Sequence, residues 1–157
     1  LGYVAQRAEA VDLFPRTAHI ETVVRLDRKS AEHFMNLYAQ PFQMIKSGRK
    51  TIELRLWDEK RQNIKIGDTI IFTNTTDGEK LEATVLNLHR FNSFQDLYQA
   101  LPLLKCGYIQ ENVHEAKASD MDVYYSKEEQ EKYGVVGIEI SLSTPITDST
   151  IVSHCKT

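Results

Sequence analysis

The sequence predicts a β-rich α+β fold: a small β-barrel with short flanking helices, preceded by a β-hairpin-like segment. Three observations support this prediction. Short runs with a two-residue hydrophobic period are separated by Asp-Gly and Gly-Asp turns, short capped helices stand between them, and a Pro-containing turn divides the first 29 residues. The 157 residues are 41% hydrophobic and 26% charged, which is typical of a globular domain long enough to bury a core.

The first 29 residues form a separate unit in this prediction. An apolar, β-branched run at residues 20–26 follows a turn at Phe14-Pro15-Arg16, so the two extended segments around that turn are expected to pair as a hairpin. A hairpin alone is marginally stable in water and needs something to pack against. The predicted organisation is therefore residues 1–29, a domain at residues 30–142, and a Ser/Thr-rich tail at residues 143–157.

The domain opens with a strand, a helix and a second strand. Residues 33–38 are a short strand candidate, and residues 41–48 are a helix of two turns. Pro41 suits the first helical position, and Gly48 suits the position after the helix. Residues 50–57 then alternate as a strand. One face carries apolar and the other polar or aromatic side chains: Ile52, Leu54 and Leu56 against Thr51, Glu53, Arg55 and Trp57.

A hairpin and a helix follow. A turn at residues 64–68 leads into a strand at residues 69–74, and the Asp77-Gly78 signal joins it to a strand at residues 79–91. Residues 93–101 read as a helix, with Ser93 and Asp96 placed to cap its first turn.

The last third of the chain is expected to contain an irregular segment followed by a helix and a strand. Residues 102–125 are expected to be helical turns and loop. Residues 126–134 are a helix with a Ser126–Glu129 capping box and a stop at Gly134, and residues 135–142 are a buried strand.

Charge is unevenly spread along the chain. Residues 41–67 carry a net charge of +4, residues 111–133 carry −4, and the whole chain carries −3. That total argues against a binder of nucleic acid by charge alone, although a local basic surface is compatible with it. Either the basic stretch faces an anionic ligand, or both stretches are solvated faces that attract each other.

Other function classes have little support. Cys106 and Cys155 are too few for a disulfide framework or a zinc site, and the five histidines show no metal-ligand spacing, so no metal is expected. The absence of a long apolar run or a leader-like start predicts a cytoplasmic protein with no membrane partner. The nearly helical spacing of Tyr124, Tyr125 and Tyr133 favours a place in the core or in a cleft wall.

Residues 32–142 resemble the ASCH domains. The likeness rests on an apolar helix ending in Gly-x-Lys, a strand with Glu-x-Arg, and a Gly-Asp turn into an apolar strand. These residues are Gly48, Lys50, Glu53, Arg55, Gly67 and Asp68. The resemblance implies a PUA-like β-barrel and a cleft for RNA or a nucleotide beside this strand. The implied ligand-binding residues are Lys50, Glu53, Arg55, Trp57, Arg49 and Lys46.

Two roles remain open for this strand. Lys50 and Arg55 would neutralise phosphate, Glu53 would accept from a base or sugar, and Trp57 or a nearby tyrosine would stack on a base. Alternatively, Glu53 forms an ordinary cross-strand ion pair. The oligomeric state is left open.

Some small ASCH proteins are amidohydrolases that deacylate acetylated cytidine, and this activity is the alternative function. The resemblance places the catalytic Lys at Lys50 but puts Glu53 where these enzymes carry a Thr nucleophile. Thr51 stands two residues earlier, so the candidate catalytic residues are Lys50, Glu53 and Thr51. A third possibility is a remnant that folds but binds no ligand.

Residues 11–26 resemble the C-terminal end of RNA uracil-5-methyltransferases through the motif Asp-x-Phe-Pro-x-Thr-x-His-x-Glu. The resemblance implies that Glu21 matches the base of that family. The cofactor loop and the Cys-Pro nucleophile are missing, so the chain alone cannot methylate. Together with the start at Leu1, this suggests a longer methyltransferase fused to an ASCH domain, or a remnant at a gene boundary. No cofactor is expected in this chain; S-adenosylmethionine would bind only in the fused enzyme.

Overall fold

The structure is a computed structural model that describes residues 2–11 and 21–143. The chain divides into two compact units, Leu1–Glu32 and His33–Thr157. In the first unit, β1 (Tyr3–Val11) pairs antiparallel with β2 (Glu21–Arg28), and Val11 lies opposite Glu21. The predicted pairing is therefore confirmed, whereas the turn at Phe14-Pro15-Arg16 and most of the methyltransferase-like motif lie outside the described residues.

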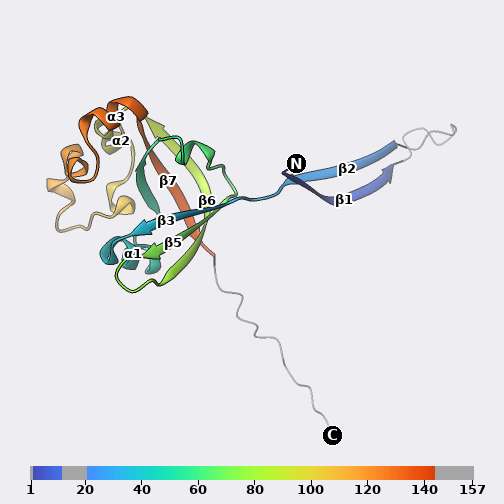
Figure 1. Ribbon diagram of the computed structural model, residues 1–157, viewed down its shortest axis with the longest axis horizontal. Coiled ribbons are helices and arrows are strands. Elements are labelled where there is room, and N and C mark those ends of the chain that lie inside the picture. Colours follow the sequence, from blue (N-terminus) through green and yellow to red (C-terminus); the bar gives the residue numbers. More distant parts are fainter. Residues whose placement is uncertain (1, 12–20, 144–157) are drawn as a thin grey trace, which may run out of the picture. The chain divides into compact units, whose positions relative to one another are not determined.

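The second unit contains a five-stranded sheet in the order β3-β5-β6-β7-β4. The strands are β3 (Glu32–Leu37), β4 (Ile52–Leu56), β5 (Thr69–Asn74), β6 (Lys80–Phe91) and β7 (Val135–Leu142). The first half of β6 pairs with β5, and most of its length pairs with β7, with a bulge between Val85 and Asn87. A bulge bends and twists a strand, which favours the curl of this sheet (Figure 1). The β-rich, PUA-like α+β fold predicted from the sequence is confirmed.

Three α-helices accompany the sheet in the described residues: α1 (Ala39–Lys46), α2 (Phe94–Ala100) and α3 (Lys127–Tyr133). Helix α1 begins two residues before the predicted Pro41; a proline is tolerated there because the first backbone N–H groups of a helix have no partner inside it. Ser93 caps α2, and the Ser126–Glu129 capping box of α3 is present as predicted.

The irregular segment between α2 and α3 consists of 3-10 turns, as expected: η2 (Leu103–Cys106), η3 (Val113–Glu115) and η4 (Ala118–Val123). This segment, α2 and α3 lie together on one side of the curled sheet (Figure 1). None of the helices in residues 2–11 and 21–143 is long and apolar enough to cross a bilayer. The predicted tail lies outside the described residues from position 144.

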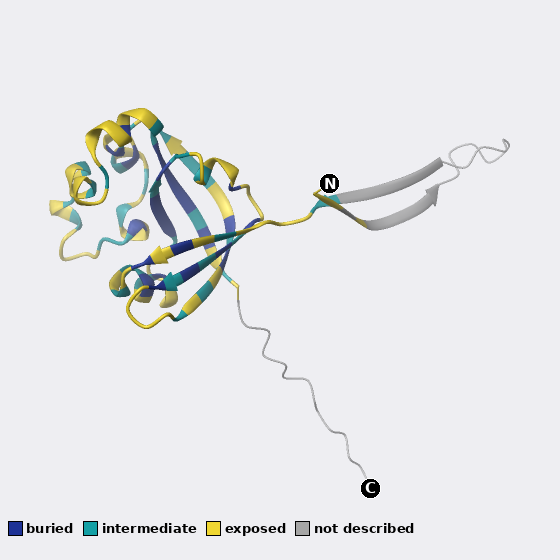
Figure 2. Ribbon diagram, viewed as in Figure 1, coloured by how far each residue is buried: buried dark blue, intermediate teal, exposed yellow. Residues whose placement is uncertain are grey.

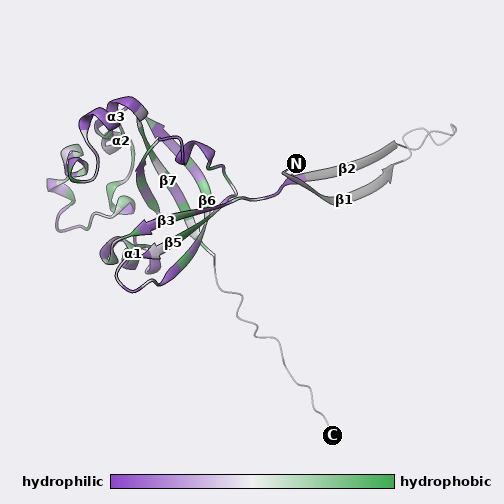
Figure 3. Ribbon diagram, in the orientation of Figure 1, coloured by the Kyte–Doolittle hydropathy of each residue, from purple (hydrophilic) through white to green (hydrophobic). Residues whose placement is uncertain are grey.

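Two hydrophobic clusters form the core. In the first, α1 packs Phe42 and Ile45 onto the inner face of the sheet; each fully buried side chain of this size contributes about 1.5–3 kcal/mol. In the second, Ile52, Leu54 and Leu56 of β4 pack against α2. Figure 2 shows the buried residues concentrated along the strands, and Figure 3 shows that the same strands carry the hydrophobic residues. Strand β4 therefore lies between apolar packing on one face and a polar site on the other.

Candidate functional site

The polar face of β4 is buried, which excludes a solvated sheet face. Glu53 is only 4% exposed, although its neighbours Ile52 and Leu54 are the core-facing residues. Lys50 Nζ lies 2.7 Å from Glu53 Oε2, and Arg55 Nε donates to Glu53 Oε1 at 2.9 Å. Glu53 does form the ion pairs that the alternative role predicted, but its partners precede and follow it along the same segment of chain, and one buried carboxylate is held between two largely buried cations.

Burial and pairing act in opposite directions on the ionisation of Glu53. Burial alone would raise the pKa of its carboxyl, but the charges and hydrogen bonds of Lys50 and Arg55 outweigh burial and hold the pKa below its usual value. For Arg55, burial lowers the pKa, and the carboxylate of Glu53 more than reverses this effect. Glu53 and Arg55 are therefore both charged at neutral pH.

Arg55 also connects the two edges of the sheet. Strands β3 and β4 are the first and last in the strand order, and the curl brings them to face each other. Arg55 Nη2 donates to the carbonyl oxygen of Asn36 in β3 at 2.9 Å. The side chain of Arg55 thus bridges a seam that backbone pairing would close in a complete barrel.

A cleft of about 570 Å³ lies at this seam, and we call it the seam cleft. Its walls come from the end of β3 with α1, from β4, from α2, and from the segment between α2 and α3. Lys50, Glu53 and Arg55 all line it. So does Asp120, whose pKa is lowered by hydrogen bonds from the backbone of Lys117 and the hydroxyl of Tyr108. The acidic stretch therefore shares a cleft with the basic one.

Gly107 lies against the side chain of Lys50. Its backbone φ is +114°, in a region that residues other than glycine rarely adopt. A Cβ built on it would lie 3.4 Å from Cδ of Lys50. The neighbouring thiol of Cys106 is buried, which raises its pKa to about 11; Lys50 lowers this pKa and Glu53 raises it. The thiol is therefore protonated at neutral pH.

The other residues expected at the site lie elsewhere. Trp57 packs on the first core cluster with the Arg90 guanidinium 4.7 Å from its ring centre. Lys46 pairs with Glu79, and Arg49 is exposed. The backbone N–H of Thr51 donates to Lys105, and its side chain is not part of the cleft wall.

Sequence reasoning missed most of the facing wall. Tyr38, which is 67% exposed, lines the cleft from the start of α1, and Tyr98 of α2 and Tyr108 after η2 line it as well. Tyr124 and Tyr125 were expected in a core or cleft wall, and both line the cleft, whereas Tyr133 packs on the second core cluster. The glycine after η2 was the one local signal for a close approach at this wall.

The curled sheet with short helices and a cleft at its seam defines a small PUA-like module. The chain belongs to the ASCH domain family, whose model matches residues 35–144. Membership in this family supports a small module of the RNA-binding type.

Two solved structures are similar to this chain. Hypothetical protein PH0355 is 34% identical with a TM-score of 0.59, over 71% of this chain and 99% of that one. Protein PF0455 from Pyrococcus furiosus is 34% identical with a TM-score of 0.57, over 73% and 99%. A comparison with curated proteins finds no match. Each of the two structures therefore leaves more than a quarter of this chain without a counterpart.

Proposed function

We propose that the ASCH unit, residues 30–142, binds single-stranded RNA or a free nucleotide by holding one unpaired nucleobase in the seam cleft. The observation that carries the proposal is a charge-balanced set of polar side chains that lines the same cleft as two exposed tyrosines. A flat ring with a hydrogen-bonding edge fits these surroundings, because every base has a π-face for stacking and an edge with donors and acceptors.

The charge balance favours a base over a phosphate inside the cleft. Lys50 and Arg55 contribute two positive charges, and Glu53 and Asp120 contribute two negative ones. An ammonium carries three N–H donors and a guanidinium five, so both cations keep donors beyond their contacts with Glu53 and Asn36. These donors can meet the carbonyl and ring-nitrogen acceptors of a base. The phosphates would lie outside, where Arg49 is exposed beside Lys50.

Tyr38 and Tyr124 are the proposed stacking residues. Both line the cleft and leave more than half of their surface exposed, so a base can cover them on binding. Stacking of a base on an aromatic ring contributes about 1–3 kcal/mol. Replacing either tyrosine by alanine should therefore weaken binding by about 5- to 150-fold.

Salt dependence separates base contacts from phosphate contacts. Fluorescence anisotropy with labelled, randomised single-stranded RNA of about ten nucleotides gives the affinity at several salt concentrations. Tyr38→Ala and Tyr124→Ala should lower the affinity with an unchanged salt slope, and Arg49→Ala should reduce the slope by about 0.7. Lys60→Ala, an exposed lysine outside the cleft, is the matched control. No binding at low salt, or tyrosine variants that bind like the wild type, would show the proposal to be wrong.

Hydrolysis of an acylated nucleoside is the second candidate. Lys50 and Glu53 are in contact within a cleft, as such chemistry would use, but the side chain of Thr51 is not part of that cleft. We therefore propose recognition as the function. Chromatography after incubation with acetylated cytidine tests the alternative: turnover that disappears in Lys50→Ala would replace our proposal.

The first unit carries a separate proposal. We infer from its sequence motif that it is the end of an RNA methyltransferase to which the ASCH unit is joined in a cytoplasmic protein. The antiparallel pairing of β1 and β2 is compatible with such a segment. The gene sequence before Leu1 tests this: a continuous frame with a Cys-Pro nucleophile and a cofactor loop supports the fusion, and a stop codon excludes it.

A further inference from the structure

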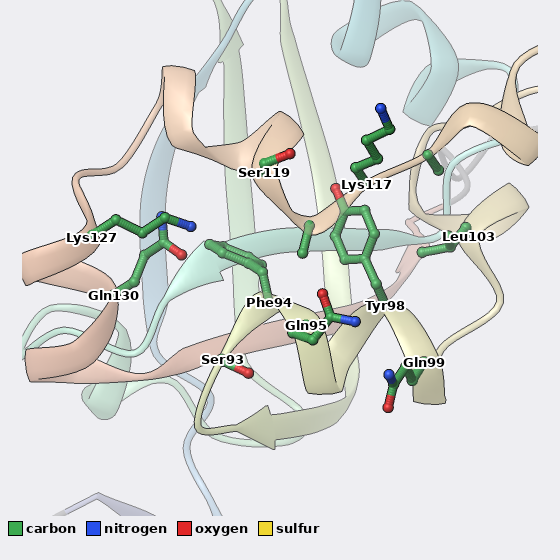
Figure 4. Close-up of a pocket in the computed structure, with 12 residues that line it drawn as sticks. Ser93, Phe94, Gln95, Tyr98, Gln99, Leu103, Lys117, Ser119, Lys127 and Gln130 are labelled. Atoms are coloured by element: carbon green, nitrogen blue, oxygen red, sulfur yellow. The ribbon is translucent and has the colours of Figure 1, made fainter.

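A second hollow of about 510 Å³ lies between α2, η4 and α3 (Figure 4). We call it the α2–α3 hollow. Tyr98 is the one residue that it shares with the seam cleft. Nothing in the proposed function uses it.

An aromatic layer separates the two sites. Phe94 and Tyr98 line the α2–α3 hollow, and Tyr98, Tyr108 and Tyr125 line the seam cleft. The Phe94 ring stacks on Tyr125 with ring centres 6.0 Å apart, and Tyr98 packs edge-on against Phe94 and Tyr108 at 6.5 and 5.9 Å. The two hollows therefore share Tyr98 and adjoin the same layer of aromatic rings.

The side chain of Gln130 contributes an acceptor to the α2–α3 hollow. The residue is 7% exposed, and its Nε2 donates to Asp122 Oδ1 at 2.9 Å and to the Tyr125 carbonyl at 3.0 Å. Both partners are acceptors, so they fix the orientation of the amide and direct Oε1 away from them. Among the described residues, no protein group donates to Oε1, and the atom is open to solvent. A ligand hydroxyl could therefore donate to Oε1 in place of water.

A cation and further neutral polar groups surround this acceptor. Lys127 Nζ lies 3.0 Å from Asp122 Oδ1, so the same carboxylate positions both Lys127 and Gln130. Both side chains extend toward Phe94 in Figure 4. Gln95 and Ser119 are exposed at the hollow, and in the described part of the chain neither side chain forms a hydrogen bond. Amide and hydroxyl groups beside one ammonium and an aromatic wall match the chemistry of a ribose phosphate.

We propose that the α2–α3 hollow holds the ribose phosphate of the nucleotide next to the one in the seam cleft. Gln130 and Gln95 form hydrogen bonds with the 2′-hydroxyl, which both donates and accepts, and Lys127 pairs with the phosphate. The hollow thereby makes the module selective for RNA over DNA, since only RNA carries the 2′-hydroxyl. This inference rests on the proposed function of the seam cleft.

Paired oligonucleotides test the inference on the full chain. Anisotropy compares oligouridine with its 2′-deoxy counterpart of the same base and of about ten nucleotides. The wild type should bind the ribose form at least about fivefold more tightly, the value of one net hydrogen bond. Gln95→Ala should bring this ratio close to one by weakening RNA binding alone. Lys127→Gln should weaken both oligonucleotides and lower the salt slope of each. The control is Gln43→Ala, an exposed glutamine on α1 outside both hollows.

The outcomes distinguish the two proposals. Equal affinity for the two oligonucleotides, or a ratio unchanged by Gln95→Ala, overturns the second site; if Tyr124→Ala still weakens RNA binding, the seam cleft stands without it. If neither oligonucleotide binds, the proposed function fails, and the second site fails with it.

Discussion

Glu53→Gln tests how much the buried ion pairs contribute to stability. The substitution keeps the size of the side chain and removes its charge, leaving Lys50 and Arg55 charged with side chains only 10% and 15% exposed. Removing one partner of a buried pair typically costs about 3–5 kcal/mol. The amide oxygen can still accept from Arg55, which favours the lower end, about 3 kcal/mol. Urea unfolding followed by circular dichroism measures this change, and the melting temperature should fall by about 10 °C or more.

Glu79→Gln is the matched control for this prediction. Glu79 pairs with Lys46, but the two side chains are 37% and 47% exposed. Exposed pairs contribute about 0–1 kcal/mol, so the control should lose at most about 1 kcal/mol. Similar losses in both variants would refute the reasoning that burial makes the Glu53 pairs strong.

Three further predictions follow from the same contacts. The pKa of Glu53 is held below its usual 4.5, so the contribution of its charge to stability is present above about pH 4.5 and is lost as the pH falls through the lowered pKa. The stability difference between the wild type and Glu53→Gln should therefore shrink in acid. A constant difference in urea titrations down to about pH 3 would contradict this prediction. In a Cys155→Ser background, Cys106 should react with iodoacetamide at pH 8 at least about a hundredfold more slowly in the folded than in the unfolded chain, because burial raises its pKa to about 11. Equal reaction rates, measured by mass spectrometry, would show that the thiol is not buried. Gly107→Ala and Gly78→Ala both place a side chain at positive φ and should each cost about 1–2 kcal/mol. Only Gly107→Ala, whose Cβ would contact the side chain of Lys50, should also weaken RNA binding, and equal affinities in anisotropy measurements would show that Gly107 does not affect the site.

Local sequence signals predicted most of the fold. The two-residue alternation gave β4 and β5, Ser93 and the Ser126–Glu129 box gave the starts of α2 and α3, and Asp77-Gly78 gave the β5–β6 turn. The curl of the sheet was harder, because it depends on a bulge within β6 and on the return of β7 between β6 and β4. Both are pairings between distant residues that no local pattern encodes.

Only the side of the site formed by β4 could be predicted from the sequence. The spacing of Lys50, Glu53 and Arg55 identified the strand, but alternation gave no information on its burial or on the balance of its charges. Trp57 shares the strand parity of Arg55, yet the strand ends at Leu56 and the tryptophan packs beside Arg90. Much of the facing wall comes from the segment of 3-10 turns between α2 and α3, whose side-chain directions follow from tertiary packing and leave no period in the sequence.

The central claim is that the seam cleft binds a nucleobase, and an NMR titration tests it most directly. Uridine and cytidine monophosphates are added to the isotopically labelled full chain while amide and side-chain shifts are recorded. We expect saturable shifts at Tyr38, Lys50 and Arg55 and around Tyr124, all of which line the cleft. Tyr124→Ala should weaken this binding, and Glu79→Gln should not. If the cleft residues show no shifts, or if the shifts are confined to exposed lysines elsewhere, the seam cleft does not bind a nucleobase.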